Sequence, residues 1–119
     1  MITTLDIETT VSKEGDPSPF NPENRLVSIG INDEYYFFYH KDVNDVEKIK
    51  ENKDKVQKIL DESTLVIGHN LKFDMSWMYE FGFTYNGKLY DTMLAEYIIM
   101  RGNKDKSLSL KECCRRHNI

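Results

Sequence analysis

Two carboxylates near the N-terminus have a spacing that suits metal binding. Asp6 and Glu8 are two residues apart in the stretch TTLDIETT. The apolar residues and threonines at 2–8 predict a strand, and side chains at positions i and i+2 of a strand leave the same face. Two like charges held together are costly unless a cation compensates them, and carboxylate oxygens suit Mg²⁺ or Mn²⁺. Because D-x-E is a common pattern, the alternative is that both side chains lie in water at a strand end.

A third candidate carboxylate, Asp74, ends the stretch GHNLKFD at residues 68–74. The nearly all-apolar run at 64–68 predicts a strand covered on both faces, and residues 71–81 predict a helix. Asn70 suits the N-cap of that helix, and Asp74 follows one turn later on the same face. We therefore expect Asp74 at the edge of the sheet where open α/β folds place their sites. The alternative is that Asp74 only interacts favourably with the helix dipole.

The third stretch, YDTML at residues 90–94, enters another predicted helix. Here the structural interpretation is the simplest, since Asp91 suits a helix N-cap. The apolar residues at 93–100 then suit a helix face in the core.

The elements that must position these side chains alternate along the chain. The predicted strands span residues 2–8, 26–32, 35–40, 64–68 and 89–90, and the predicted helices span residues 43–62, 71–81, 92–100 and 108–117. Short spacing between the second and third strands predicts that the first three strands form an antiparallel meander. We expect Gly82 to end the second helix and Ser107 or Ser109 to cap the last. A meander followed by β-α-β-α-α predicts an α/β domain with a mixed central sheet and helices on its faces.

Size and charge narrow the class of protein. A chain of 119 residues is at most one domain, and its net charge of −4 argues against a broad phosphate-binding face. Residues 101–119 are nevertheless basic, with six Lys or Arg against two acidic residues, so this end either touches a polyanion or is a solvated surface. The sequence has no apolar run of the roughly 18 residues that a membrane span needs. Its first residues also lack the features of a signal peptide, so we expect a cytoplasmic protein without a membrane partner.

Taken together and in this order, the three stretches resemble the proofreading 3′–5′ exonuclease domain of family A (Klenow-type) DNA polymerases. That domain belongs to the DEDD, or DnaQ-like, exonuclease superfamily, which has a ribonuclease H-like fold. LDIETT resembles the first motif of the family and GHNLKFD the second, which is the most specific. Residues 90–114 resemble the segment between the second and third motifs. The resemblance covers essentially the whole chain.

The resemblance implies a two-metal mechanism acting at the 3′ end of single-stranded DNA. Two divalent ions, Mg²⁺ or Mn²⁺, then lie between the carboxylates and straddle the scissile phosphate. Asp6 is expected to bridge both ions and Glu8 to ligate one of them while placing the water or the 3′ hydroxyl. Asp74 is expected to contact the second ion through water.

The resemblance also implies residues that contact nucleic acid. Asn70 is expected to hold the nucleic acid or the motif itself, and Thr9 and Thr10 to supply backbone contacts near the 3′ end. Phe73 and Tyr90 are candidate stacking platforms for splayed bases. For both aromatic residues the alternative is a place in the core.

The family's third motif, Tyr or His followed four residues later by a metal-binding Asp, has no match in this sequence. None of the ten aspartates has Tyr or His four positions before it. We therefore expect residues 1–119 to be a partial, C-terminally truncated exonuclease domain that cleaves DNA weakly or not at all alone. A polymerase domain in cis or a partner chain, in a bacterial or phage-infected cell, would complete it. The alternatives are an RNA-processing exonuclease of the ribonuclease D type and a non-catalytic module that binds nucleic acid or protein.

Overall fold

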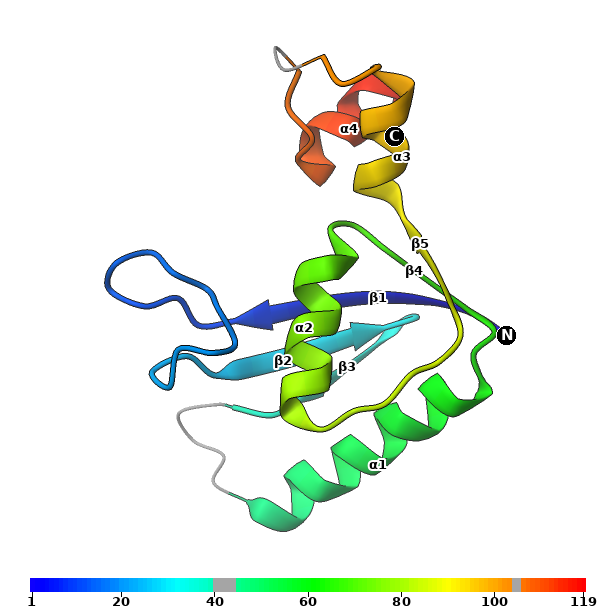
Figure 1. Cartoon of the computed structure of the whole chain (residues 1–119). Helices are drawn as coiled ribbons and strands as arrows, with labels where there is room; N and C mark the ends of the chain where they lie inside the picture. Colours follow the sequence, from blue (N-terminus) through cyan, green and yellow to red (C-terminus); the bar gives the residue numbers. More distant parts are fainter. Residues whose placement is uncertain (40–44, 104–105) are drawn as a thin grey trace.

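The computed structural model describes residues 1–39, 45–103 and 106–119. Over this part of the chain, five strands and four helices follow the predicted order β-β-β-α-β-α-β-α-α (Figure 1). The strands are β1 (Ile2–Thr9), β2 (Leu26–Ile31), β3 (Glu34–Phe37), β4 (Leu65–Gly68) and β5 (Lys88–Asp91). The helices are α1 (Val46–Glu62), α2 (Leu71–Phe81), α3 (Thr92–Ile99) and α4 (Leu110–Arg116). The parts of the predicted third strand and first helix that fall on residues 40 and 43–44 lie outside the described residues.

The strands form one mixed sheet in the order β3-β2-β1-β4-β5. The first three strands pair antiparallel, which confirms the predicted meander, whereas β4 pairs parallel to β1 and to β5. β1 therefore lies at the centre of the sheet. This arrangement agrees with the ribonuclease H-like fold that the resemblance implied.

The central strand β1 separates apolar from charged side chains by simple alternation. Thr3, Leu5 and Ile7 are buried, whereas Asp6 and Glu8 on the opposite face are exposed. The two carboxylates therefore share one face, as predicted, and they lie within the strand rather than at a frayed end. The alternation of apolar and charged residues along β1 therefore gives the strand one face in the core and one charged face.

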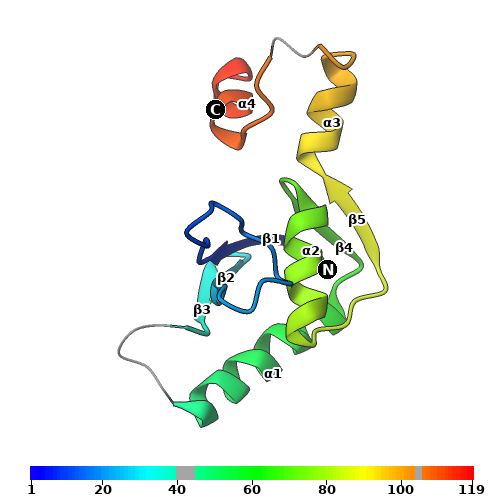
Figure 2. The same cartoon turned by 60° about the vertical axis from the view of Figure 1, so that its left-hand side comes forward.

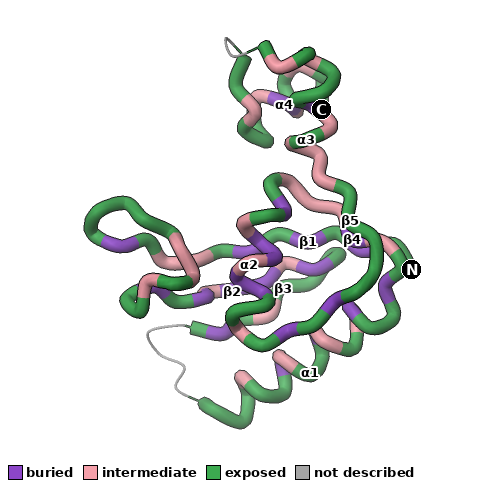
Figure 3. The backbone as a smooth tube through the Cα atoms, viewed as in Figure 1, coloured by how far each residue is buried: buried purple, intermediate pink, exposed green. Residues whose placement is uncertain are grey.

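Both α1 and α2 cover the core face of the sheet (Figures 1 and 3). Val56 and Leu60 of α1 are almost fully buried, as are Leu71 and Met78 of α2. These residues join one hydrophobic cluster with the inward side chains of β1, β2 and β4. Burial against the sheet, more than intrinsic helix propensity, holds such helices in place.

The opposite face of the sheet is much more open. Tyr35 and Phe37 of β3 are 70% and 53% exposed, and only Val66 of β4 is buried, while Leu65 and Ile67 are half-buried. The prediction that β4 is covered on both faces is therefore wrong for the described residues. The helices following β4 and β5 do not fold back over this face.

Instead, α3 continues from β5 and extends away from the sheet, with α4 packed beside it (Figures 1 and 2). As a result Leu94, Ile98 and Ile99 are exposed, and the expected core position of residues 93–100 is wrong. No helix in the described residues is long and apolar enough to cross a membrane.

Candidate active site

Asp6 and Glu8 stand on the open face of the sheet opposite Gly30 and Ser28 of β2. Neither side chain makes an ion pair or a hydrogen bond with any described residue, so no cationic side chain compensates their negative charges there. Beside Asp6 is a hollow of about 110 Å³, which Gly30 and Tyr35 help to line. A side chain at Gly30 would approach the backbone oxygen of Asp6 to 3.3 Å, so glycine keeps this space open.

Asp74 comes from the first turn of α2 and is only 4% exposed. Its Oδ2 atom is buried without a hydrogen-bond partner in the described structure. Burial, followed by the negative charge of Asp6, raises the pKa of the Asp74 carboxyl from 3.8 to about 7. This value includes a hydrogen bond from the Ile7 backbone, which lowers the pKa, and smaller raising effects of the charges of Asp91 and Glu8. The pKa shift therefore couples Asp74 to both carboxylates of β1.

These donors suit a divalent cation chemically. A cation would compensate the like charges of Asp6, Glu8 and Asp74, and carboxylate oxygens are the ligands that Mg²⁺ and Mn²⁺ prefer. The orphaned Oδ2 of Asp74 is an acceptor that a metal or a metal-bound water would satisfy. The described residues nevertheless contain no group of three His, Cys, Asp or Glu side chains close enough to hold an ion on their own. An ion here needs additional ligands, such as water or phosphate.

The threonines that follow Glu8 lie where β1 runs into the 11–25 loop. Thr9 ends β1 and is half-buried. Thr10 closes the loop, because its N–H donates to the carbonyl of Arg25 (2.9 Å) and its Oγ1 accepts from the Arg25 N–H (2.7 Å). The hydroxyl oxygen of Thr10 therefore already accepts a hydrogen bond within the protein. Thr9 directly follows Glu8 in the sequence.

The two candidate stacking residues lie in different surroundings. Phe73 of α2 is half-buried and packs against the hydrophobic cluster, which favours the core alternative. It also lines a cavity of about 360 Å³ together with Phe20, an exposed aromatic residue of the 11–25 loop that sequence reasoning missed. Tyr90 of β5 is 51% exposed, so its core alternative is wrong. The strand register places Tyr90 on the same sheet face as Asp6.

The N-terminus of α2 is not capped by the side chain that the sequence predicted. Asn70 is the N-cap residue by position, but its side chain makes no capping hydrogen bond and its backbone is left-handed (φ 62°, ψ 53°). The Asp91 carboxylate supplies the cap instead, accepting from the N–H groups of Asn70 and Leu71 at 2.9 Å each. Asp91 also caps α3 through the Met93 N–H (2.8 Å), as predicted.

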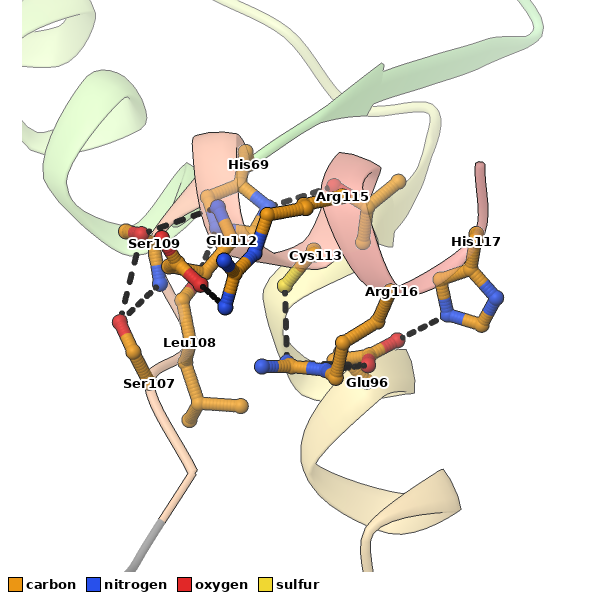
Figure 4. Close-up of polar contacts among 11 residues, drawn as sticks. His69, Glu96, Ser107, Leu108, Ser109, Glu112, Cys113, Arg115, Arg116 and His117 are labelled. Atoms are coloured by element: carbon orange, nitrogen blue, oxygen red, sulfur yellow. Dashed lines mark hydrogen bonds and ion pairs between the residues drawn. The ribbon is translucent and has the colours of Figure 1, made fainter. Parts of the chain in front are cut away.

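Side-chain contacts tie α3 and the segment before α4 to this turn (Figure 4). His69 Nε2 donates to the Leu108 carbonyl (2.5 Å), and His69 Nδ1 lies 2.9 Å from Thr92 Oγ1. The Thr92 hydroxyl in turn donates to the carbonyl of Gly68 at 3.1 Å. Since these pairs are 23 to 39 residues apart along the chain, no local pattern predicted them.

A buried carboxylate joins α3 to α4. Glu96 is 5% exposed and meets Arg116 Nη2 at 3.0 Å and His117 Nε2 at 2.8 Å (Figure 4). The hydrogen bond from His117, assisted by Arg116, lowers the pKa of Glu96 below its ordinary value although burial opposes this. Two basic residues of the C-terminal end are thus occupied by an internal contact rather than presented to a polyanion.

The order of the strands and helices, with the three motifs along them, is compatible with a ribonuclease H-like exonuclease. A model of the 3′–5′ exonuclease family matches residues 4–118, and the chain belongs to this family. A similar protein is DNA polymerase I of Aquifex aeolicus (strain VF5), which is 34% identical over 75 residues. That match covers 63% of this chain but 12% of the length of the polymerase. The predicted resemblance to the exonuclease domain of DNA polymerases is therefore confirmed.

Proposed function

We propose that this chain is the proofreading part of a DNA polymerase and removes nucleotides from the 3′ ends of single-stranded DNA. Asp6, Glu8 and Asp74 are proposed to hold two divalent ions, Mg²⁺ or Mn²⁺. The observation that carries the proposal is the buried Oδ2 of Asp74, which lacks a partner among the described residues and belongs to a carboxyl coupled to Asp6 and Glu8. A shifted pKa with a specific charged partner is characteristic of functional sites.

The individual roles are taken from the resemblance to the exonuclease family. Asp6 is proposed to touch both ions, and Glu8 to ligate one and to place the water or the 3′ hydroxyl. Asp74 is proposed to contact the second ion through water. Ions bound in such a site activate a water molecule and stabilise the departing 3′ oxygen.

The DNA is proposed to lie on the open sheet face. Tyr90 shares that face with Asp6 and is exposed, so it can stack on a base. Phe73, which lies on α2 and not on this sheet face, is the second proposed stacking residue and lines a cavity together with Phe20. Thr9 and Thr10 are proposed to supply backbone contacts near the 3′ end of the strand, and Asn70 to hold the nucleic acid or the motif itself.

The fourth metal-binding aspartate and the residue that orients the water are proposed to come from outside these 119 residues. A polymerase domain in cis is the preferred source, because the similar protein is a DNA polymerase I and the match covers 12% of it. A partner chain is the other source. Such a protein would act in the cytoplasm of a bacterial or phage-infected cell, and the chain alone would cleave weakly or not at all.

Mn²⁺ binding tests the proposed site independently of cleavage. Free Mn²⁺ is measured by electron paramagnetic resonance during titration of the chain and of Asp6→Asn, Glu8→Gln and Asp74→Asn. Asp54→Asn is the matched control, since Asp54 is exposed on α1. We expect each site variant to weaken binding by at least tenfold and the control to match the unmodified chain.

The same proteins are then mixed with single-stranded DNA and RNA labelled at the 5′ end. Mn²⁺-dependent DNA shortening, slow in the chain and absent in the site variants, supports the proposal. Preferential RNA shortening would favour the ribonuclease D type. Nucleic-acid binding without any Mn²⁺ binding would contradict the proposal and favour a non-catalytic module.

A further inference from the structure

One carboxylate outside the proposed metal set bonds the starts of two helices at once. Asp91 Oδ1 accepts from the N–H groups of Asn70 (2.9 Å) and Met93 (2.8 Å), and Oδ2 accepts from the Leu71 N–H (2.9 Å). Asn70 and Leu71 begin α2, whereas Met93 lies in the first turn of α3. Both oxygens of Asp91 are therefore used by backbone donors.

The start of α2 depends on this distant residue. The first N–H groups of a helix have no partner within the helix, and the Asn70 side chain, which normally satisfies one, makes no such bond. Asn70 is left-handed instead (φ 62°), a conformation that is uncommon outside glycine. Hydrogen bonds from N–H groups to a carboxylate are stronger than those to neutral acceptors. Asp91 thus anchors α2 from the end of β5.

The anchored turn is also tightly packed against the central strand. Gly68, which pairs with Asp91 in the sheet, lies so close to β1 that an added Cβ would be 2.9 Å from the Leu5 carbonyl. The same Cβ would collide with the side chain of Leu71. The backbone of the turn therefore has little room to shift once Asp91 holds it.

Asp74 follows this turn by one helical turn and points toward β1. Because a helix moves as a rigid unit over one turn, the orientation of residues 70–71 sets where the Asp74 carboxyl lies relative to Ile7. Displacements of about 1 Å in a supporting element are enough to impair a site. The contacts of Asp91 are therefore in a position to control the geometry of Asp74.

We propose that Asp91 is a positioning residue of the exonuclease site: it anchors the first turn of α2 to the end of β5 and so holds Asp74 in place to bind metal. This inference rests on the proposed function, since it assumes that Asp74 binds metal. Asp91 does not touch the metal or the DNA in this account. It acts through the backbone of α2.

The test compares Asp91→Asn with Asp91→Ala, with Asp54→Asn as the control. Both Asp91 variants remove the same charge, but asparagine keeps one oxygen that can accept a backbone hydrogen bond. Mn²⁺ affinity is measured by electron paramagnetic resonance at a temperature where circular dichroism shows each variant to be folded. Exchange of the Asn70 and Leu71 amide protons is followed by nuclear magnetic resonance on the same samples.

We expect roughly a tenfold loss of Mn²⁺ affinity for Asp91→Ala, as for other residues that support metal ligands, and a smaller loss for Asp91→Asn. Amide exchange at residues 70–71 should accelerate in the same order. If the two Asp91 variants lose the same Mn²⁺ affinity, the loss comes from the missing charge and not from the missing hydrogen bonds. That result would overturn the positioning role. Wild-type affinity in both would overturn it too, while leaving the metal site intact. An unmodified chain that binds no Mn²⁺ would overturn the proposed function and this inference together.

Discussion

Asp74→Asn is expected to stabilise the metal-free protein at alkaline pH. The Asp74 side chain is 4% exposed, one of its oxygens has no partner within the described structure, and Asp6 lies near it. Ionising this carboxyl without a metal ion therefore places a charge in an unfavourable environment. Asparagine has almost the same shape and carries no charge, so it removes that cost.

The size of the effect follows from the pKa. Folding raises the pKa of Asp74 from 3.8 to about 7, so at intermediate pH the native state keeps a proton that the unfolded state has lost. Unfolding then releases a proton, and the free energy of unfolding falls as pH rises. Between about pH 5 and about pH 8 this amounts to roughly 2 pKa units, or about 3 kcal/mol. The unmodified chain should lose this much more stability than Asp74→Asn over that range.

Urea denaturation in the presence of a chelator measures the difference directly. Trp77, the single tryptophan, is 5% exposed and reports unfolding by fluorescence. Asp54→Asn should follow the unmodified chain at every pH, which controls for a change in net charge. Mn²⁺ added at about pH 8 should stabilise the unmodified chain but not Asp74→Asn, because a ligand that binds the native state raises its stability. Parallel curves of unfolding free energy against pH for the unmodified chain and Asp74→Asn would show that folding does not raise the pKa of Asp74.

Three further outcomes are expected. Gly68→Ala should lower the free energy of unfolding by about 1–3 kcal/mol, because the new Cβ would approach the Leu5 carbonyl to 2.9 Å; an unchanged urea midpoint would contradict this. Glu96→Gln should speed amide exchange in α4 but not in α1, since Glu96 loses its ionic contacts with Arg116 and His117; equal exchange in α4 would count against it. In the unmodified chain, acidification below the ordinary Glu96 pKa of 4.5 should weaken the same contact, because its partners lower that pKa and the stability they provide is lost as pH falls; protection of the α4 amides that does not change on this acidification would oppose this.

Local patterns were enough to predict the elements that carry the site. The alternation in β1 put Asp6 and Glu8 on one face, and the helix Leu71–Phe81 ends at Gly82, whose left-handed backbone (φ 103°) suits glycine. These features depend on neighbours within a few residues. Sequence reasoning therefore reached them without knowledge of the packing.

Contacts between residues far apart in the sequence could not be predicted from local patterns. Asn70 looked like the cap of α2, but the Asp91 carboxylate, 21 residues away, does the capping. The apolar residues of α3 looked like a core face, yet the helix extends from the sheet and buries Glu96 instead. The raised pKa of Asp74 likewise depends on burial and on charges from β1. Each of these features is a property of the tertiary arrangement.

Asp6, Glu8 and Asp74 are proposed to form a metal site. Anomalous X-ray diffraction from crystals of the chain soaked in Mn²⁺ and a short single-stranded DNA tests it most directly. We predict an anomalous peak beside β1 on the open face of the sheet, within bonding distance of a carboxylate oxygen of Asp6, with Asp74 facing it directly or through a water molecule. A fully soaked crystal with no peak at these carboxylates, or with Mn²⁺ bound only elsewhere, would contradict the account.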